Sequence, residues 1–300
     1  MSAVELGATL YVPAINPVLG AVVRGSIAEL RSAVICLEDS IRDDQVDDAL
    51  TRVEMLLATL AASPPTLSVY VRPRDLGMFC RLMDLPGIDR VDGFVLPKVT
   101  TQSLPGWLSA LMHDNHRIMP TIEGEEAFDR QALARLCDQL RPYAERVSAV
   151  RIGGNDILGL LGIRRSRVRT AYDGPLGSVI RDIAGTFIPN GFAVAAPVFE
   201  HYGEPDVLRR EVEQDIEHGL LTKTAIHPSQ IATIHSVYRP ALTEMNEARA
   251  VLDADAPGVF GSNGSMCEPA THSRWAGMIV RRAQIYGVTG PEHRPDALVA

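Results

Sequence analysis

Short apolar runs alternate with longer segments of helical periodicity along most of this chain. Eight runs rich in Val, Ile, Leu and Ala are bounded by Gly, Pro or charged residues and predict strands: residues 8–13, 33–40, 66–75, 93–99, 117–125, 148–156, 191–200 and 221–230. The second run is apolar from Ala33 to Leu37 before two acids end it. Such a pattern is typical of a parallel strand that is buried on both faces.

The segments between these runs place apolar residues at helical spacing. Between residues 43 and 61, apolar side chains recur every three or four positions until Ser63, Pro64 and Pro65 end the pattern. Helices are predicted on the same grounds for the segment up to Leu30, for a long segment that ends at Asn190–Gly191, and for residues 125–140, 206–218, 241–254 and 272–286. Eight strands that alternate with helices predict an α/β fold, the (β/α)8 TIM barrel. A doubly wound sheet is the alternative, but it does not need eight successive units.

The pattern changes near Arg239. Residues 1–239 are predicted to form a catalytic barrel domain, and residues 240–300 a C-terminal extension of helices. A Gly- and Ser-rich stretch, PGVFGSNGSMCEP, separates the two helices of the extension. We predict a flexible loop there, which could close over a barrel mouth as a lid.

The bulk composition is that of an ordinary globular protein, with 46% apolar and 22% charged residues among 300. The formal charge of −8 argues against non-specific nucleic-acid binding, which needs a basic surface. No apolar run approaches the roughly 20 residues of a membrane span, and the first residues do not have the pattern of a signal peptide. The four cysteines are scattered along the chain, which predicts free thiols in a reducing compartment. We therefore expect a cytoplasmic protein with no nucleic-acid or membrane partner.

Two acids follow apolar runs at the positions where barrel strands carry their chemistry. Glu123 follows the run at 117–122, and Asp156 follows the run at 149–152, with room for one helix between them. Two carboxylates suit Mg²⁺, which takes one or two protein carboxylates together with waters and substrate oxygens. The alternative is that each acid caps the next helix or lies in its first turn, where the helix dipole favours a negative charge. The pattern alone leaves both interpretations open.

Further charged residues end neighbouring runs. Arg72 could clamp a carboxylate or phosphate bidentately, or form a salt bridge with a strand-end acid such as Asp39. Glu38 and Asp39 point to opposite sides of their strand, so at least one should face the mouth, where it could orient Arg72 or hold a metal-bound water. Lys98 could neutralise a substrate charge, or could pair with Glu123 and serve stability alone.

Other motifs carry less information. His227, before Pro228, is more simply a residue that holds a turn than a catalytic one. The four arginines within residues 164–169 could meet a phosphate or could be solvated. The chain contains no Walker loop, no G-x-G-x-x-G and no G-x-S-x-G, so nucleotide hydrolysis, dehydrogenase and serine-hydrolase functions lack their motifs.

Taken together, the strand ends resemble those of the citrate lyase β-subunit-like branch of the HpcH/HpaI aldolase superfamily. The landmarks of that family occur here in order over nearly the whole chain: LYVP, CLEDS, VYVRPRD, GFVLPKV, MPTIEGEEAF, RIGGNDILGLLG and KTAIHPSQI. The resemblance implies a (β/α)8 lyase or aldolase of the oxo-acid-lyase type, or the reverse synthase, that depends on Mg²⁺ or on Mn²⁺ in its place. It also implies a 2-oxo acid or a citryl- or malyl-type CoA thioester as substrate, and a homotrimer or homohexamer.

The same resemblance assigns roles to individual residues. Glu123 and Asp156 would be the metal ligands, and Arg72 would hold the substrate carboxylate or carbonyl oxygen. The neighbouring acids and lysine would support the metal waters, Arg72 and the substrate: Glu38, Asp39 and Lys98. The turn Gly153–Gly154–Asn155 would offer backbone N–H groups to substrate oxygens.

The family places an acid of the C-terminal lid in the site of a neighbouring subunit. Glu268 stands where the family has Asp, and we expect it to be the general acid or base. Strand three also departs from the family pattern, with Arg-Pro-Arg-Asp from Arg72 to Asp75. These departures keep two alternatives open: a thioesterase-like activity at the same metal site, and a non-catalytic barrel that binds an acidic metabolite or an operon partner.

Overall fold

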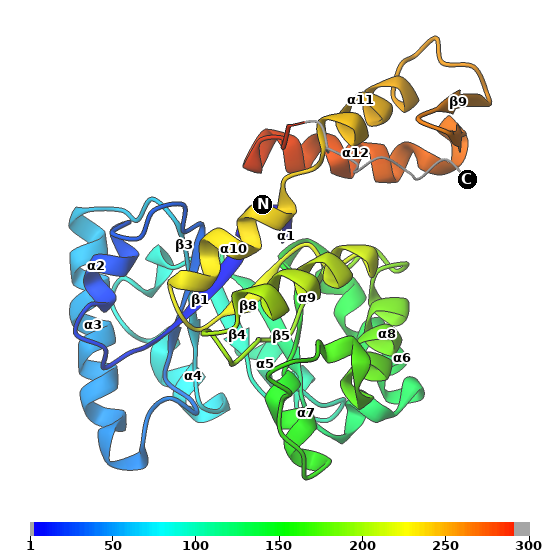
Figure 1. Cartoon of the computed structure of the whole chain (residues 1–300). Helices are drawn as coiled ribbons and strands as arrows, with labels where there is room; N and C mark the ends of the chain where they lie inside the picture. The colour runs from blue at the N-terminus through cyan, green and yellow to red at the C-terminus, as the bar shows by residue number, and fades with distance from the viewer. Residues whose placement is uncertain (1–2, 291–300) are drawn as a thin grey trace. The chain divides into compact units, whose positions relative to one another are not determined.

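The computed structural model describes residues 3–290 (Figure 1). The chain divides into two compact units, Met1–Ile234 and His235–Ala300. The division lies within helix α10 (Ser229–Tyr238), a little before the predicted boundary at Arg239. Each unit is described by itself. No helix in the described part of the chain combines the length and the apolar character that crossing a membrane requires.

The first unit is built on eight parallel strands: β1 (Ala8–Pro13), β2 (Ser32–Cys36), β3 (Ser68–Arg72), β4 (Gly93–Leu96), β5 (Arg117–Ile122), β6 (Val150–Ile152), β7 (Val194–Ala195) and β8 (Lys223–Ala225). Their order in the sheet is β7-β6-β5-β4-β3-β2-β1-β8. The two ends of this sheet meet at Ala196, whose N–H donates to Thr222 O (2.8 Å) and whose carbonyl accepts from the Thr224 N–H (3.3 Å). These bonds close the sheet into a barrel, which confirms the (β/α)8 prediction.

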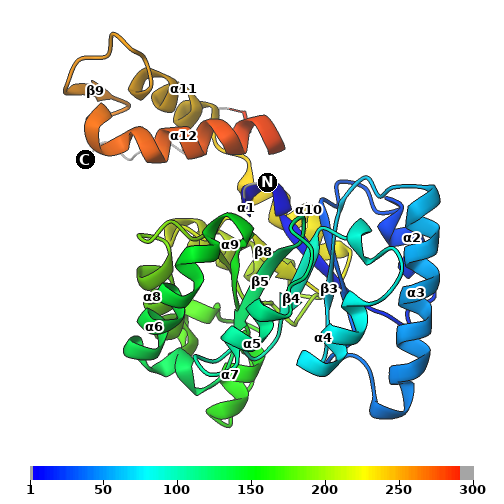
Figure 2. The same ribbon diagram turned by 180° about the vertical axis from the view of Figure 1, so that it is seen from behind.

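Helices follow the strands around the barrel: α2 (Leu19–Val23), α3 (Val46–Ala62), α4 (Leu76–Met83), α5 (Leu104–Ser109), α6 (Arg130–Leu140), α7 (Gly154–Leu160), α8 (Pro175–Phe187) and α9 (Pro205–Glu217). Figures 1 and 2 view the unit from opposite sides and show α2, α3 and α4 on one flank and α6, α7 and α8 on the other. The strands between them are therefore covered by apolar helix faces, which explains why their sequences are continuously apolar.

An apolar layer fills the interior of the barrel at the level of the strand centres. It consists of one buried side chain from each of five strands, Val34, Tyr70, Val95, Met119 and Ala195, together with Ala149, which immediately precedes β6. The short helix α1 (Ala3–Leu6) adds Ala3 and Leu6 to the same cluster. Because this layer is apolar, the residues that can carry chemistry are the inward-facing ones that follow it along each strand.

Several predicted elements of this unit are shorter in the structure, among them one helix and one strand. The helical segment predicted up to Leu30 forms a helix only from Leu19 to Val23, and the left-handed Gly25 (φ 86°) follows its end. The strand predicted at 191–200 is paired only at Val194 and Ala195. Pro197 follows closely, and proline has no N–H to donate to a ladder.

The second unit packs two helices, α11 (Leu242–Val251) and α12 (Pro269–Tyr286), around a small apolar core that includes Met245, Ala248 and Ile279. The segment between them is not the loop that was predicted. It forms an antiparallel hairpin of β9 (Phe260–Ser262) and β10 (Ser265–Cys267). The turn residues Asn263 and Gly264 both have positive φ (48° and 78°), which a two-residue hairpin turn requires.

Candidate functional site

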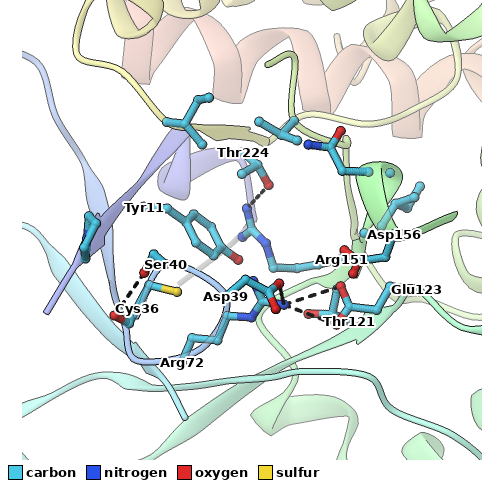
Figure 3. Close-up of a pocket in the computed structure, with 17 residues that line it drawn as sticks. Tyr11, Cys36, Asp39, Ser40, Arg72, Thr121, Glu123, Arg151, Asp156 and Thr224 are labelled. Carbon is cyan, nitrogen blue, oxygen red and sulfur yellow. Dashed lines mark hydrogen bonds and ion pairs between the residues drawn. The ribbon is translucent and has the colours of Figure 1, made fainter. Parts of the chain in front are cut away.

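A cavity of about 380 Å³ opens at the carboxyl ends of the barrel strands, above the apolar layer. Its walls come from strands that are far apart in the sequence, as Figure 3 shows: β1 contributes Tyr11, β3 Arg72, β6 Arg151 and β8 Thr224. Both predicted metal ligands, Glu123 and Asp156, line the same cavity. The structure therefore places the predicted carboxylates in the one location where barrels of this kind perform chemistry.

Glu123 is the most buried acid of the cavity wall, with 1% of its side chain exposed. Its Oε1 accepts a hydrogen bond from the backbone N–H of Lys98 (2.7 Å), and both oxygens accept from Nη2 of Arg72 (3.3 and 3.5 Å). It makes no capping bond to the helical turn that follows, where Gly124 is the N-cap residue. The capping interpretation is therefore wrong for Glu123.

Asp156 approaches the cavity from the next strand connection. Strands β5 and β6 pair directly, so the prediction that the two acids follow adjacent strands is confirmed. Asp156 lies in the first turn of α7, as the alternative interpretation predicted, and it also lines the cavity. No described residue donates a hydrogen bond to its carboxylate or pairs with it, so its oxygens are available to a ligand.

Arg72 is held by acids on both sides. Its Nη2 lies 2.6 Å from Oε2 of Glu38, 3.3 Å from Oε1 of Glu123 and 3.7 Å from Oδ2 of Asp39. Only 11% of the Arg72 side chain and 3% of the Glu38 side chain are exposed. The predicted salt bridge thus forms, with Glu38 rather than Asp39 as the nearer partner. Two buried carboxylates offset the guanidinium charge and fix its position at the cavity wall.

Lys98 pairs with the acids after β2 rather than with Glu123. Its Nζ lies 2.7 Å from Oε1 of Glu38 and 3.3 Å from Oδ1 of Asp39, while only its backbone N–H reaches Glu123. Lys98 has a left-handed backbone (φ 48°), unusual for a residue with a side chain. Hydrogen bonding to Glu38 raises the Lys98 pKa above its usual range, so the ammonium stays charged.

The two acids after β2 differ in exposure. Glu38 is buried, and burial raises the pKa of its carboxyl despite the opposing charge of Arg72. Asp39 is 56% exposed and lines the cavity. Its partial burial acts to raise its pKa, but the hydrogen bond with Glu38 and the charges of Arg72 and Lys98 outweigh that effect and lower it. Neither Glu38 nor Lys98 is among the described residues that line the cavity, so both act on it through Arg72, Asp39 and Glu123.

The turn Gly153–Gly154–Asn155 passes beside Glu123. The Gly153 N–H donates to Ile122 O (3.0 Å), so it is engaged by the strand and not available to a substrate. A Cβ at Gly153 would lie 2.2 Å from Oε2 of Glu123, which only glycine avoids. The side chain of Asn155 donates to Oε2 of Glu200 (3.3 Å). The other two predicted substrate donors, the N–H groups of Gly154 and Asn155, lie in the first turn of α7. N–H groups in this position have no partner within the helix, so a substrate can bind them.

Glu268 belongs to the second unit, between β10 and α12. Its backbone N–H donates to Nδ1 of His272 (3.0 Å), and its carboxylate accepts from the Thr271 hydroxyl (3.2 Å). It is the N-cap residue of α12, but its side chain makes no capping bond.

The weaker sequence candidates are accounted for by local contacts. Arg164 pairs with Glu200 (2.8 Å), and the buried Arg165 pairs with Glu211. His227 bonds through Nδ1 to the Ser229 hydroxyl (2.7 Å) at the start of α10, which is the turn-holding role expected for it. Three further residues, Arg151, Tyr11 and Thr224, line the cavity, although the sequence pattern predicts no role for them. Their inward direction follows from strand alternation, but nothing in the local sequence marks them as polar contacts.

The donor set fits Mg²⁺. A carboxylate has about four lone-pair sites, and Glu123 uses only some of them on Arg72 and Lys98, while Asp156 has none engaged by a described residue. Among the described residues no group of three or more His, Cys, Asp or Glu side chains is placed to hold a metal. Mg²⁺ does not require such a cage, because waters and substrate oxygens complete its six positions.

Metal affinity is expected to rise with pH between 6 and 8. Burial, together with the neighbouring charge of Asp156, raises the pKa of Glu123 to about 7 against the opposing effect of Arg72. Mg²⁺ binds the deprotonated carboxylate, so below that pKa each pH unit should weaken binding about tenfold. Isothermal titration calorimetry at pH 6, 7 and 8 measures this directly. A dissociation constant that does not change over this range would contradict the assignment of Glu123 as a ligand of the metal.

Comparisons with known proteins agree with the fold. A family model described as C–C bond lyase of the TIM-barrel fold matches residues 1–288. An L-malyl-CoA/beta-methylmalyl-CoA lyase of Cereibacter sphaeroides is 22% identical, with 92% of this chain and 94% of the relative aligned. A citrate lyase subunit beta-like protein of Deinococcus radiodurans is 24% identical over 79% of this chain and 84% of its own.

A solved structure shows the same fold. The protein CitE of Mycobacterium tuberculosis, in complex with magnesium, acetoacetate and coenzyme A, superposes with a TM-score of 0.70 at 20% sequence identity. The superposition covers 94% of this chain and 99% of that one. The resemblance inferred from the strand-end motifs is thus confirmed, and the chain belongs to the C–C bond lyase family of the TIM-barrel fold.

Proposed function

We propose that this lyase is Mg²⁺-dependent and cleaves, or in reverse forms, a carbon–carbon bond next to the carbonyl group of a small 2-oxo acid or a citryl- or malyl-type CoA thioester. The observation that carries the proposal is the meeting of Glu123 and Asp156 at the wall of one cavity, beside a guanidinium that buried acids hold in place. The named activities of the relatives, and the magnesium, acetoacetate and coenzyme A of the solved structure, support the same class of reaction.

Glu123 and Asp156 would hold the metal, which supplies a positive charge against the negative charge that develops on the carbonyl oxygen when the bond breaks. Arg72 would present its guanidinium to the same oxygen, since its ion pairs with Glu38 and Glu123 hold it in place. Asp39 lines the cavity and could hold a water of the metal by a hydrogen bond. The N–H groups of Gly154 and Asn155 would orient the substrate from the α7 side.

The reaction needs one proton removed or returned at carbon, and we propose Glu268 for that role. Glu268 would act in the site of a neighbouring subunit, which requires an assembly such as a homotrimer or homohexamer. Light scattering that shows a monomer at the concentrations used for the assay would rule out this arrangement.

Turnover with Mg²⁺ tests the proposal. We expect the protein to release a 2-oxo acid from at least one malyl- or citryl-type CoA thioester when Mg²⁺ is present, detected as the phenylhydrazone. EDTA should remove the activity and added Mg²⁺ should restore it, because only two carboxylates of the cavity wall, Glu123 and Asp156, would hold the metal.

The same assay separates the alternatives. Release of free CoA without a 2-oxo acid would mean a thioesterase at this site. Ligand-induced thermal stabilisation without any turnover would mean a non-catalytic barrel. Activity that persists in EDTA would contradict the metal-dependent mechanism.

A further inference from the structure

A second arginine, Arg151, lies inside the barrel on β6. Its side chain points inward from the middle of the strand and lines the cavity, although the residue is only 2% exposed. Figure 3 shows it reaching across the pocket toward Thr224, with the Tyr11 ring beside it. A cation at this depth needs an explanation, because burying a charge is costly unless a partner offsets it.

The protein supplies only neutral partners to this guanidinium. Nη2 donates to Oγ1 of Thr224 (2.7 Å), Nη1 contacts Sδ of Met119 (3.2 Å), and the guanidinium carbon lies 5.2 Å from the centre of the Tyr11 ring. No carboxylate of the described residues forms an ion pair with Arg151. A guanidinium has five N–H donors, and the contacts above leave several of them unused.

The other buried arginines of this unit differ in this respect. Arg72 lies between Glu38 and Glu123, and Arg165 pairs with Glu211. Because their charges are offset by acids of the chain, an incoming anion gains less from them. Arg151 is therefore the arginine of the cavity wall whose positive charge is not offset by any acid of the described residues.

Strand register gives the position of Arg151 relative to the metal ligands. Arg151 pairs with Thr121 of β5, and Glu123 follows two residues later toward the mouth. Two residues of a strand span about 6–7 Å. A small molecule that meets the metal at Glu123 and extends toward the barrel base would therefore bring its far end to Arg151.

We propose that Arg151 and Thr224 form an anion subsite at the inner end of the cavity, which binds a substrate carboxylate remote from the metal. The inference rests on the proposed function and deepens it, because it names the substrate class as acids that carry a second carboxylate. The planar fork of the guanidinium matches a carboxylate, and a charge-assisted pair in this buried place would stabilise the complex more than it would at the surface. Arg72 then serves the reacting carbonyl, not the remote end.

Paired ligands that differ by one carboxylate test the subsite. Malate and lactate are stable 2-hydroxy acids that share one end and differ in the second carboxylate. With saturating Mg²⁺, the wild-type protein should bind malate about tenfold or more tightly than lactate in calorimetry. Arg151→Met should remove this preference and leave lactate affinity within about twofold. Arg151→Lys, which keeps the charge but not the fork, should retain part of it.

Arg130→Met is the matched control, since Arg130 is exposed and pairs with Asp182 away from the cavity. It should keep the full preference. Titration of Mg²⁺ without any acid is run on each variant, so that a failure of the metal site is seen separately. A wild-type protein without preference for malate, an Arg151→Met variant that keeps the preference, or equal losses for both acids would overturn the subsite.

Stability provides a second readout. Replacing a buried charge that has no acidic partner with Met should leave the midpoint of chemical denaturation unchanged or higher. A structural role for Arg151 predicts the opposite. A clear loss of stability in Arg151→Met, with none in Arg130→Met, would therefore count against the subsite.

Discussion

Mg²⁺ binding is expected to disappear when both carboxylates are neutralised, Glu123→Gln together with Asp156→Asn. The amides keep the shape of the side chains but remove both negative charges that face the cavity. No third protein ligand of the His, Cys, Asp or Glu type stands beside them among the described residues, so nothing in that part of the chain can take over. Calorimetry should show no Mg²⁺ binding, and turnover should fall about a thousandfold or more.

Glu125→Gln is the control for this variant. Glu125 follows Glu123 closely in the chain but is exposed on the 3-10 turn after β5 and does not line the cavity. It should bind Mg²⁺ like the wild type. Unchanged Mg²⁺ binding in the double variant, with its fold intact by circular dichroism, would show that the metal does not bind at these acids.

Replacing Arg72 with Met is expected to cost about 3–5 kcal/mol of unfolding free energy. The change leaves Glu38 and Glu123 buried without the guanidinium that offsets their charge, with 3% and 1% of their side chains exposed. The pKa of Glu123 should then rise further, because Arg72 is the strongest of the interactions that now lower it. Urea denaturation measures the loss, and Mg²⁺ affinity at pH 7 should fall with it.

Arg74→Met provides the comparison, two residues further along the same connection. Arg74 pairs with Asp43, which is 95% exposed, and with the carbonyl of Ile41. Surface pairs of this kind contribute little, so the expected loss is about 1 kcal/mol. Equal losses for the two variants would contradict the buried network around Arg72.

Much of the barrel could be predicted because its strands are continuously apolar and its connections are short. Residues 117–122 show this well, since the apolar run and β5 coincide, although the predicted strand continued to residue 125. The hairpin in the second unit differs from the predicted loop, because a Gly- and Ser-rich composition is typical of loops and does not by itself indicate strands. The Asn263–Gly264 pair is the local signal that predicts a two-residue hairpin turn, and it was present in the sequence.

The placement of Glu123 and Asp156 at one cavity was predictable, because each acid follows an apolar strand run. The site was not predictable where a contact depends on long-range closure of the barrel. Arg151 reaches Thr224 across 73 positions of sequence, which no local pattern reveals. The pairing of Lys98 depends on its left-handed backbone, which turns its N–H rather than its ammonium toward Glu123.

Crystals grown with Mn²⁺ in place of Mg²⁺ give the most direct test of the metal site, because Mn²⁺ scatters anomalously and takes similar oxygen ligands. The account predicts an anomalous peak at the cavity wall, with oxygens of both Glu123 and Asp156 as ligands of the metal. A fully loaded crystal with no peak between these two carboxylates, or with the metal held elsewhere in the chain, would contradict it.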